Sequence, residues 1–387
     1  MVSFTRGLVL AATLVTAVLA TPRPSEGCGN NIKTSLTPGG PSKSFTFDSN
    51  AGDGEEMKRR VRIYLPESYE SDSPTPVILA LHGKFRNGTS FEHVTDFSNS
   101  KYNKDAIVLY PDGIDVRLPA SRSVQMILTT LLQLRWTGDP YAPKLRKNND
   151  IKYAGELLDQ IESSFCVDKS RIYVTGFSNG GGLAHLLACD PILSSRIAAF
   201  AIASGGFFTK KAMTQEGAMQ KDLFNPANCK PSRSPIPIIE FHGDDDEMYV
   251  YDGNSVFDGP TYPITGWLRS WAERNSCDYS SGQKTSLLKG RVHKYNWECG
   301  VKSDKPILQH YLLHGVGHTW PSVSLLREGE NFPDPMLFDG TPIIKEFFEA
   351  HELPDNAASE TPKDETEKAS TAEPEAETVK AEIKDEL

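Results

Sequence analysis

One serine of the chain lies in a setting that could make it a nucleophile. Ser178 is the centre of the G-x-S-x-G sequence 176–180, which follows the apolar run 172–175 and precedes a helix-like apolar stretch. A strand, a sharp turn and a helix in this order expose the hydroxyl and aim the free N–H groups of the helix N-terminus at a developing oxyanion. Glycine and serine also occur in purely structural turns, but the strand and helix around this one favour a nucleophile.

A serine hydroxyl becomes nucleophilic when a histidine takes its proton. His318 lies in a glycine-flanked loop after the apolar run 309–313, and the loop after the last strand is where such a base is expected. His314 is the competing residue, but it directly ends the run and could be a packed polar side chain. We therefore predict His318 as the base.

The histidine in turn needs a carboxylate that orients it. Asp244, Asp245 and Asp246 follow the apolar run 236–241, and their spacing does not choose among them. Such an acidic cluster could also be a solvated loop or a calcium site, although calcium loops usually separate their ligands by other residues. The position just beyond a buried strand favours the orienting acid.

A glycine-containing loop follows the apolar run 77–81 and could supply part of an oxyanion hole. We predict the backbone N–H groups of Lys84 and Asn179 as the two donors, and we interpret His82 as structural. Asn87 opens an Asn-Gly-Thr glycosylation sequon close to this loop, so an attached glycan would crowd the site.

Apolar runs recur along the chain, and helix-like stretches separate several of them. The runs cover residues 61–65, 77–81, 106–110, 172–175, 198–203, 236–241 and 309–313. Continuous apolar strands are typical of a sheet that is buried on both faces. Their alternation with helices predicts an α/β fold with a mostly parallel central sheet and helices on both faces.

The bulk composition is that of a folded, acidic protein. Of its 387 residues 38% are hydrophobic, and the formal net charge is −10. This charge argues against a nucleic-acid partner, because phosphate binding needs a basic surface. We expect one catalytic domain over residues 21–355.

Both ends of the chain are typical of targeting segments. Residues 1–20 carry an early Arg6, an apolar run and small residues before the expected cleavage, which predicts a signal peptide; as a membrane anchor the run is short. Residues 356–387 hold ten acidic and four basic side chains and should be disordered. The tail ends in Lys-Asp-Glu-Leu, which is the sequence of a signal for retrieval to the endoplasmic reticulum. In a tail rich in lysine and glutamate the same four residues could also occur by coincidence. We expect secretion, with the lumen of the endoplasmic reticulum and a retrieval receptor as the alternative.

Six cysteines in an oxidising compartment predict three disulfides. We predict Cys166–Cys189, because the start of a strand and the end of the next helix lie on the same side of a βα unit. Proximity in sequence suggests Cys277–Cys299, which leaves Cys28–Cys229. Metal binding is the competing interpretation, but the chain has no CxxC spacing, and we expect no metal site.

Taken together, the motifs resemble those of secreted fungal feruloyl esterases of the type C/D group, in carbohydrate esterase family 1, which are akin to polyhydroxybutyrate depolymerases. The matching pieces are Leu81-His82-Gly83, Tyr110-Pro111-Asp112-Gly113, Trp136-Thr137-Gly138-Asp139-Pro140, residues 165–168, 176–182, 187–190, 234–237, Phe241-His242-Gly243 and Gly317-His318-Thr319-Trp320-Pro321. They run in order from about residue 28 to residue 348, so that the resemblance covers nearly the whole mature domain.

The resemblance implies an α/β-hydrolase fold and a choice of the acid. The acid of the family comes three residues after its His-Gly pair, which is Asp246 here, and the resemblance also favours His318. It further implies hydrolysis of ferulate esters on the arabinose of plant cell-wall xylan through an acyl-enzyme, with neither a metal nor an organic cofactor.

Residues 116–133 depart from the family, in which the Tyr-Pro-Asp-Gly segment leads almost directly into the Trp-x-Gly-Asp segment. Removing them would join Asp115 to Leu134. Splice signals could encode three parts of this insert: Val-Arg at its start, Ile-Leu-Thr within it and Gln at its end. We therefore interpret the insert as a retained intron. Transcript sequencing would test this interpretation.

Two other functions compete with a feruloyl esterase. An acetylxylan esterase or a polyhydroxyalkanoate depolymerase could use the same scaffold and the same Ser178. A non-catalytic protein of the secretory pathway, retained by its tail, is the alternative from another class. A fluorophosphonate probe would separate that class from the enzymes, because only an activated serine reacts with it.

Overall fold

The computed structural model describes most of the chain. It covers residues 21–32, 34–52, 56–115, 134–140, 142, 149–209, 213–214, 217–218, 222–255, 259–300, 305–322, 338–354 and 384–385. The predicted signal peptide at 1–20 and the insert at 116–133 lie outside the described residues. Among the described residues no helix is long and apolar enough to cross a bilayer.

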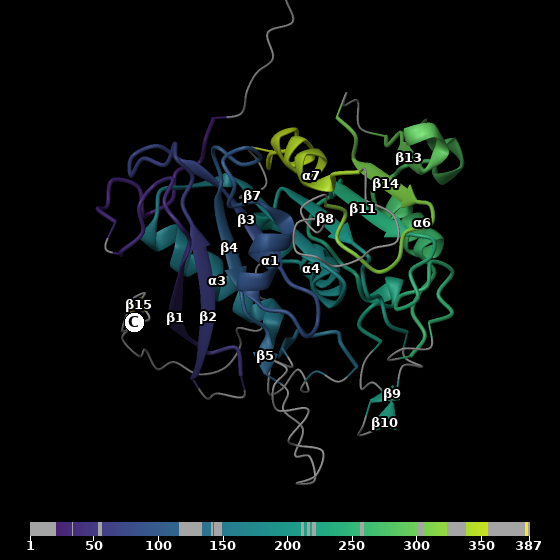
Figure 1. The fold of residues 1–387 in the computed structure, drawn as a ribbon, viewed down its shortest axis with the longest axis horizontal. Helices are drawn as coiled ribbons and strands as arrows, with labels where there is room; N and C mark the ends of the chain where they lie inside the picture. Colours follow the sequence, from purple (N-terminus) through teal and green to yellow (C-terminus); the bar gives the residue numbers. More distant parts are fainter. Residues whose placement is uncertain are drawn as a thin grey trace, which may run out of the picture.

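A single large sheet organises the molecule. Its strands are β1 (Lys43–Ser49), β2 (Met57–Tyr64), β3 (Thr75–Leu81), β4 (Ile107–Pro111), β7 (Val167–Phe177), β8 (Ala199–Ala203), β11 (Ile238–Gly243), β12 (Gln283–Leu287), β13 (Val292–Trp297), β14 (Leu308–Leu313) and β15 (Lys384–Asp385). Their spatial order is β12-β13-β14-β11-β8-β7-β3-β4-β2-β1-β15. Figure 1 shows β1 and β2 at one side of the molecule and β13 and β14 at the other.

The centre of the sheet is parallel and its edges are antiparallel. β4, β3, β7, β8, β11 and β14 pair in parallel. β2 and β1 on one side, and β13 and β12 on the other, run antiparallel to their neighbours. The central strands coincide with the apolar runs of the sequence because both of their faces are buried. The predicted α/β fold with a mostly parallel central sheet is confirmed.

Helices cover both faces of this sheet. They are α1 (Gly88–Thr95), α3 (Asp150–Ser164), α4 (Asn179–Cys189), α5 (Leu193–Arg196), α6 (Ile264–Arg274) and α7 (Gly340–Glu349). Side chains of α3, α4 and α6 join one hydrophobic core, and those of α1 and α7 join a second core. Alternate residues of one strand divide between the cores, as Leu79 and Ile78 of β3 do. The prediction of helices on both faces is therefore confirmed as well.

Three short strand pairs lie outside the central sheet or at its edge. β5 (Ile114–Asp115) pairs antiparallel with β6 (Leu134–Arg135), so the two ends of the insert are held side by side. β9 (Met213–Thr214) pairs with β10 (Gly217–Ala218). β15 pairs with Phe45 and Thr46 of β1, so two residues of the tail that we predict to be disordered form an edge strand. An edge strand such as β1 offers unpaired backbone groups to an extended segment.

The disulfides differ from the predicted set in two of three pairs. Cys277 is bonded to Cys299, as the sequence predicts, but Cys28 is bonded to Cys166 and Cys189 to Cys229. The predicted Cys166–Cys189 and Cys28–Cys229 pairs are therefore wrong.

The course of the N-terminal arm explains this correction. The arm runs along the start of β7, where the N–H of Ser25 donates to the carbonyl of Val167 and the N–H of Gly27 donates to that of Glu162. This path places Cys28 beside Cys166. At the far end of α4, the N–H of Lys230 donates to the carbonyl of Cys189, which brings the neighbouring Cys229 to it instead.

The Cys28–Cys166 disulfide should stabilise the fold strongly. Serine at both positions is expected to lower the free energy of unfolding by about 2 to 5 kcal/mol, measured by urea denaturation. The loss should exceed that for serine at Cys277 and Cys299, because the bridged residues are 138 apart in the first case and 22 in the second. Peptide mapping without reduction checks the pairing, and a peptide joining Cys166 to Cys189 would contradict it.

Candidate active site

Ser178 occupies a sharp turn between β7 and α4. Its φ of 57° and ψ of −121° lie in a region that residues with a side chain rarely adopt. Two flanking glycines make this turn possible. A Cβ on Gly176 would lie 2.2 Å from the carbonyl oxygen of Gly180, and a Cβ on Gly180 would lie 2.1 Å from that of Leu81. The G-x-S-x-G spacing is therefore a steric requirement of the turn.

Three strand ends bring the predicted serine, histidine and aspartate together. Ser178 follows β7, Asp246 follows β11 and His318 follows β14. The Ser178 hydroxyl donates to His318 Nε2 over 2.8 Å, and His318 Nδ1 donates to Asp246 Oδ2 over 2.8 Å. Ser178 and Asp246 are buried, and 11% of the His318 side chain is exposed. This geometry can move a proton from the serine to the histidine.

The competing residues of the sequence analysis pair with each other instead. His314 Nδ1 donates to Asp244 Oδ2 over 2.6 Å, and its Nε2 lies 2.7 Å from His293 Nδ1. Asp245 is exposed. The structure therefore places Asp246 and His318, rather than their neighbours, next to Ser178.

The Asp246 carboxylate is fixed by its own loop. Its Oδ1 accepts hydrogen bonds from the N–H groups of Met248, over 2.9 Å, and Tyr249, over 2.8 Å. Burial raises the pKa of Asp246, but the hydrogen bond from His318 and the charges of His318 and His242 outweigh it, so that the pKa falls below its ordinary value. The carboxylate therefore stays ionised and can stabilise a cationic His318.

A second buried pair of charges lies behind Asp246. His242 Nε2 donates to the carbonyl of Tyr249 over 2.7 Å and lies 3.4 Å from Asp246 Oδ2, while its Nδ1 donates to Glu240 over 3.0 Å. The other oxygen of Glu240 is 2.6 Å from His310 Nδ1. Burial lowers the pKa of His242, but the hydrogen bond and charge of Glu240 raise it more. Burial likewise raises the pKa of Glu240, and the two histidines lower it more.

The predicted oxyanion donors lie on two segments that meet at Ser178. Asn179 is the first residue of α4, and its buried side-chain oxygen accepts from the N–H of Trp136 over 2.8 Å. Lys84 follows Gly83, on which a Cβ would lie 3.2 Å from Cβ of Ser178. The two segments are thus positioned beside the serine, as an oxyanion hole requires.

His82 is a structural residue, as the sequence suggests. Its Nε2 accepts from the N–H of Gly113 over 3.0 Å, and its Nδ1 lies 2.7 Å from the carbonyl of Gly83. Burial lowers its pKa to about 4. The imidazole is therefore neutral at pH 7 and holds the loop in place.

The rim of the site carries an exposed aromatic side chain that the sequence analysis missed. Phe85 is 46% exposed and has a φ of 63°. The guanidinium of Arg135 lies 4.9 Å and the ammonium of Lys84 lies 5.3 Å from the centre of its ring. Asn87, the predicted glycosylation site, is half-buried nearby, where its side-chain oxygen caps α1 by accepting from the N–H of Ser90.

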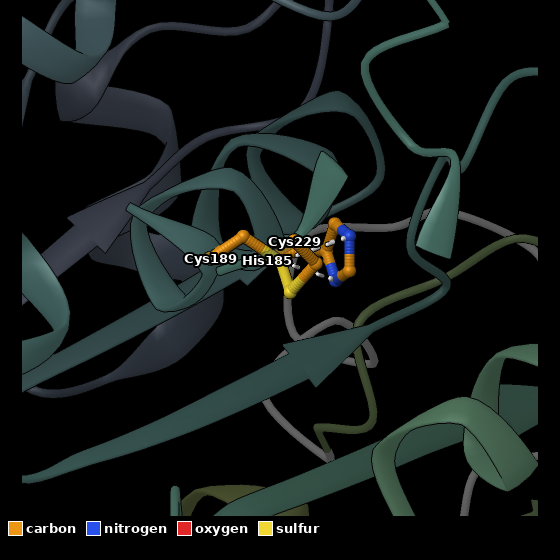
Figure 2. Close-up of side chains that lie close together, drawn as sticks. All are labelled: His185, Cys189 and Cys229. Carbon is orange, nitrogen blue, oxygen red and sulfur yellow. Dashed lines mark hydrogen bonds between the residues drawn. A yellow bond between two sulfur atoms is a disulfide. The ribbon is translucent and has the colours of Figure 1, made fainter. Parts of the chain in front are cut away.

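Figure 2 shows the group among the described residues whose atoms are spaced as metal ligands could be: His185, Cys189 and Cys229. The two sulfurs are joined in a disulfide. Zinc binds cysteine as the thiolate, and these two cysteines are therefore not zinc ligands in this state. His185 Nδ1 accepts from the indole N–H groups of Trp267 and Trp271, over 3.0 and 3.2 Å. Burial lowers the pKa of His185 to about 3. The group is therefore a disulfide packed beside a neutral histidine.

The sequence contained a signal for the buried charges of Glu240, His242 and His310. Glu240 and His310 are polar residues inside the apolar runs 236–241 and 309–313, and the two strands pair them directly. A charge in an otherwise apolar strand indicates a buried partner. Tyr249 and the exposed Phe85 had no comparable signal.

The strand order and the turn at Ser178 are those of an α/β-hydrolase fold. Residues 54–219 match the Esterase family, and this part of the chain contains Ser178. A solved acetyl xylan esterase from Aspergillus awamori superimposes with a TM-score of 0.50 at 18% identity, over 80% of this chain and 100% of that one.

Two curated relatives share sequence with the chain. Feruloyl esterase B from Piromyces equi is 25% identical over 252 residues, which are 63% of this chain and 40% of the relative. Feruloyl esterase D from Neurospora crassa is 22% identical over 316 residues, 81% of this chain and 88% of the relative. The matched region thus spans less than half of the first relative.

The Glu240–His242 pair gives a pH-dependent prediction for Glu240→Gln. This variant should lower the free energy of unfolding by about 3 kcal/mol near pH 6, because it removes the charged hydrogen-bond partner of His242 Nδ1 while the histidine stays buried. The raised pKa of His242 means that its contribution is complete below the unfolded pKa and is lost as the pH rises through the folded pKa. The difference between variant and wild type should therefore shrink at alkaline pH.

Urea denaturation of both proteins at several pH values provides the test. His314→Gln, which removes the partly exposed hydrogen bond from His314 to Asp244 instead, is the control and should change stability by less than about 1 kcal/mol. A difference between Glu240→Gln and wild type that grows with pH would contradict the assignment of a charged His242.

Proposed function

We propose that the chain is a serine carboxylesterase that hydrolyses feruloyl and related hydroxycinnamoyl esters of plant cell-wall arabinoxylan. The observation that carries the proposal is the continuous hydrogen-bonded chain from the Ser178 hydroxyl through His318 to Asp246. Its three members come from separate strand ends, and the buried Asp246 carboxylate orients His318 and can stabilise its cation.

The geometry defines the order of proton transfers. Ser178 Oγ attacks the ester carbonyl while His318 Nε2 takes its proton, and Asp246 stabilises the imidazolium that forms. The imidazolium then gives this proton to the oxygen of the leaving sugar alcohol, which leaves an acyl group on Ser178. Water repeats the sequence on the acyl-enzyme, with His318 again as the base, and releases the acid.

The negative charge that develops on the carbonyl oxygen requires fixed donors. The N–H of Asn179 is at the N-terminus of α4, where helical N–H groups have no partner within the helix. We assign it and the N–H of Lys84 as the oxyanion hole. The hydrogen bond from Trp136 to the Asn179 side chain and the contacts of Gly83 hold both segments in advance of the reaction, which is the condition for strong stabilisation.

Support for an aromatic acid comes from the relatives and from the rim. Two relatives carry the name feruloyl esterase. The exposed Phe85 ring, beside the oxyanion loop, offers a face on which an aromatic acid can stack. The proposal makes residues 21–355 the catalytic domain, and the three disulfides favour a protein of the secretory pathway.

A panel of substrates with a Ser178→Ala variant tests the proposal. Wild type should hydrolyse methyl ferulate with a higher kcat/KM than acetylated xylan or a hydroxybutyrate polymer. Ser178→Ala should lose about 10⁵- to 10⁶-fold in kcat, because the nucleophile is removed. The control is Ser163→Ala, at an exposed position of α3, which should keep wild-type activity.

Different results of this panel have different meanings. Turnover that survives in Ser178→Ala would contradict the serine mechanism. Preference for acetylated xylan would keep the mechanism and move the proposed substrate to acetyl esters.

Phe85→Ala tests the stacking of the acid. The variant should raise the KM for methyl ferulate about tenfold and change hydrolysis of p-nitrophenyl acetate less than about twofold, because only the aromatic acid loses a contact. Ile192→Ala, which alters another exposed apolar side chain beyond the far end of α4, is the control. Equal effects of Phe85→Ala on both esters would show that the ring does not contact the acid.

A further inference from the structure

Tyr249 places a buried hydroxyl next to the reacting serine. The residue is 1% exposed, and its hydroxyl lies beside that of Ser178. In the geometry of the structure it makes no well-formed hydrogen bond within the described parts of the chain. A buried polar group without a partner is costly, so that such groups are rare away from functional sites.

The loop of the triad acid holds this side chain in place. The N–H of Tyr249 donates to Asp246 Oδ1 over 2.8 Å, and its carbonyl accepts from His242 Nε2 over 2.7 Å. Its ring meets the ring of His318 edge-on, with centres 5.0 Å apart and an angle of 83° between the planes. The backbone therefore fixes the tyrosine to Asp246 while the ring packs against the base.

The opposite side of the ring is equally confined. A Cβ on Gly206 would lie 2.8 Å from the Tyr249 ring and 3.2 Å from its hydroxyl oxygen, and the N–H of Gly206 donates to the carbonyl of Ser178 over 3.0 Å. Glycine at this position thus allows the hydroxyl to approach the serine. The tyrosine has little freedom to turn its hydroxyl away from the reaction centre.

The position of the hydroxyl determines which substrate oxygen it can reach. The donors assigned to the carbonyl oxygen come from Lys84 and Asn179, whereas Tyr249 comes from the loop after β11 and packs on His318. The oxygen of the leaving alcohol must approach His318 Nε2 to receive its proton. A donor beside both Ser178 and His318 is therefore on the side of the leaving oxygen.

We propose that Tyr249 is a catalytic residue of the esterase proposed above, whose hydroxyl donates a hydrogen bond to Ser178 Oγ in the free enzyme and to the leaving alcohol oxygen during acylation. No proton leaves the tyrosine. The proton from Ser178 passes to His318 and then to the alcohol oxygen as the carbon–oxygen bond of the ester breaks. The Tyr249 hydroxyl partly stabilises the charge on that oxygen before the proton arrives.

The strong burial of Tyr249 is consistent with a donor that keeps its proton. Burial raises the pKa of the hydroxyl well above its ordinary value, and the charge of Asp139 raises it further. The Tyr249 hydroxyl therefore stays protonated at neutral pH. It can donate a hydrogen bond but cannot serve as a base.

Tyr249→Phe tests the proposal, because it removes the hydroxyl and keeps the ring that packs on His318 and Gly206. The comparison uses methyl ferulate, with a poor leaving group, and p-nitrophenyl ferulate, with a good one that needs no help. The variant should lower kcat/KM for methyl ferulate about tenfold to a hundredfold, and that for p-nitrophenyl ferulate less than about threefold. Its melting temperature should stay close to that of wild type, because the ring keeps its packing and only one hydrogen bond is lost.

Tyr153→Phe is the matched control. Tyr153 is also a buried tyrosine whose hydroxyl has no hydrogen bond within the described residues, but it stacks on Phe47 of β1, away from the triad. This variant should keep both kcat/KM values within about twofold of wild type.

The outcomes separate the two proposals. If Tyr249→Phe keeps its activity on both esters, or loses it equally on both, Tyr249 only fills space or supports His318, and the inference is overturned while the esterase stands. If wild type hydrolyses neither ester, both proposals fail together. A selective loss on methyl ferulate, with the control unaffected, supports the catalytic role of Tyr249.

Discussion

The backbone of Ser178 is held in a conformation that a residue with a side chain avoids, and the surrounding structure is arranged to hold it there. The turn exists because β7 stops at Phe177 and α4 begins at Asn179, with carbonyl oxygens packed where side chains of Gly176 and Gly180 would otherwise be. Such strain persists only where neighbouring contacts enforce it. Here the parallel sheet supplies them, since the end of β3 contacts Gly180 directly. As a result, the Ser178 hydroxyl lies at the N-terminus of a helix and faces the loop that carries His318.

Behind the serine, charge is organised as a buried series that crosses the sheet. Carboxylates and histidines alternate in this series, and each member lies 2.6 to 3.4 Å from the next in the order Asp246, His242, Glu240 and His310. Each buried charge is tolerable because the next one is its partner, and the loss of one member leaves another unpaired. The series links the loop after β11 to the strand β14, and both of these segments deliver members of the triad. The position of Asp246 is therefore a property of two strands rather than of one loop.

Much of this was predictable from particular residues. The apolar runs located the central strands because a parallel sheet buries both faces, and the glycines around Ser178 located the turn because no other residue fits there. Edge strands such as β1 and β13 were missed, since more than half of their residues are only partly buried and polar residues among them break the apolar pattern. The disulfides failed for a different reason. Their pairing depends on how the N-terminal arm crosses the start of β7, and local sequence does not encode that path. Tyr249 likewise depends on a loop conformation, which the hydrogen bonds of its backbone to His242 and Asp246 fix.

The central claim is that the adjacent His318 activates Ser178 as a nucleophile. Reaction of the purified protein with a fluorophosphonate, followed by digestion and mass spectrometry, measures this directly, because only a serine with an adjacent base reacts readily. We predict one adduct per molecule, on the peptide that contains Ser178. The absence of an adduct from correctly folded protein, or an adduct on another serine, would contradict it.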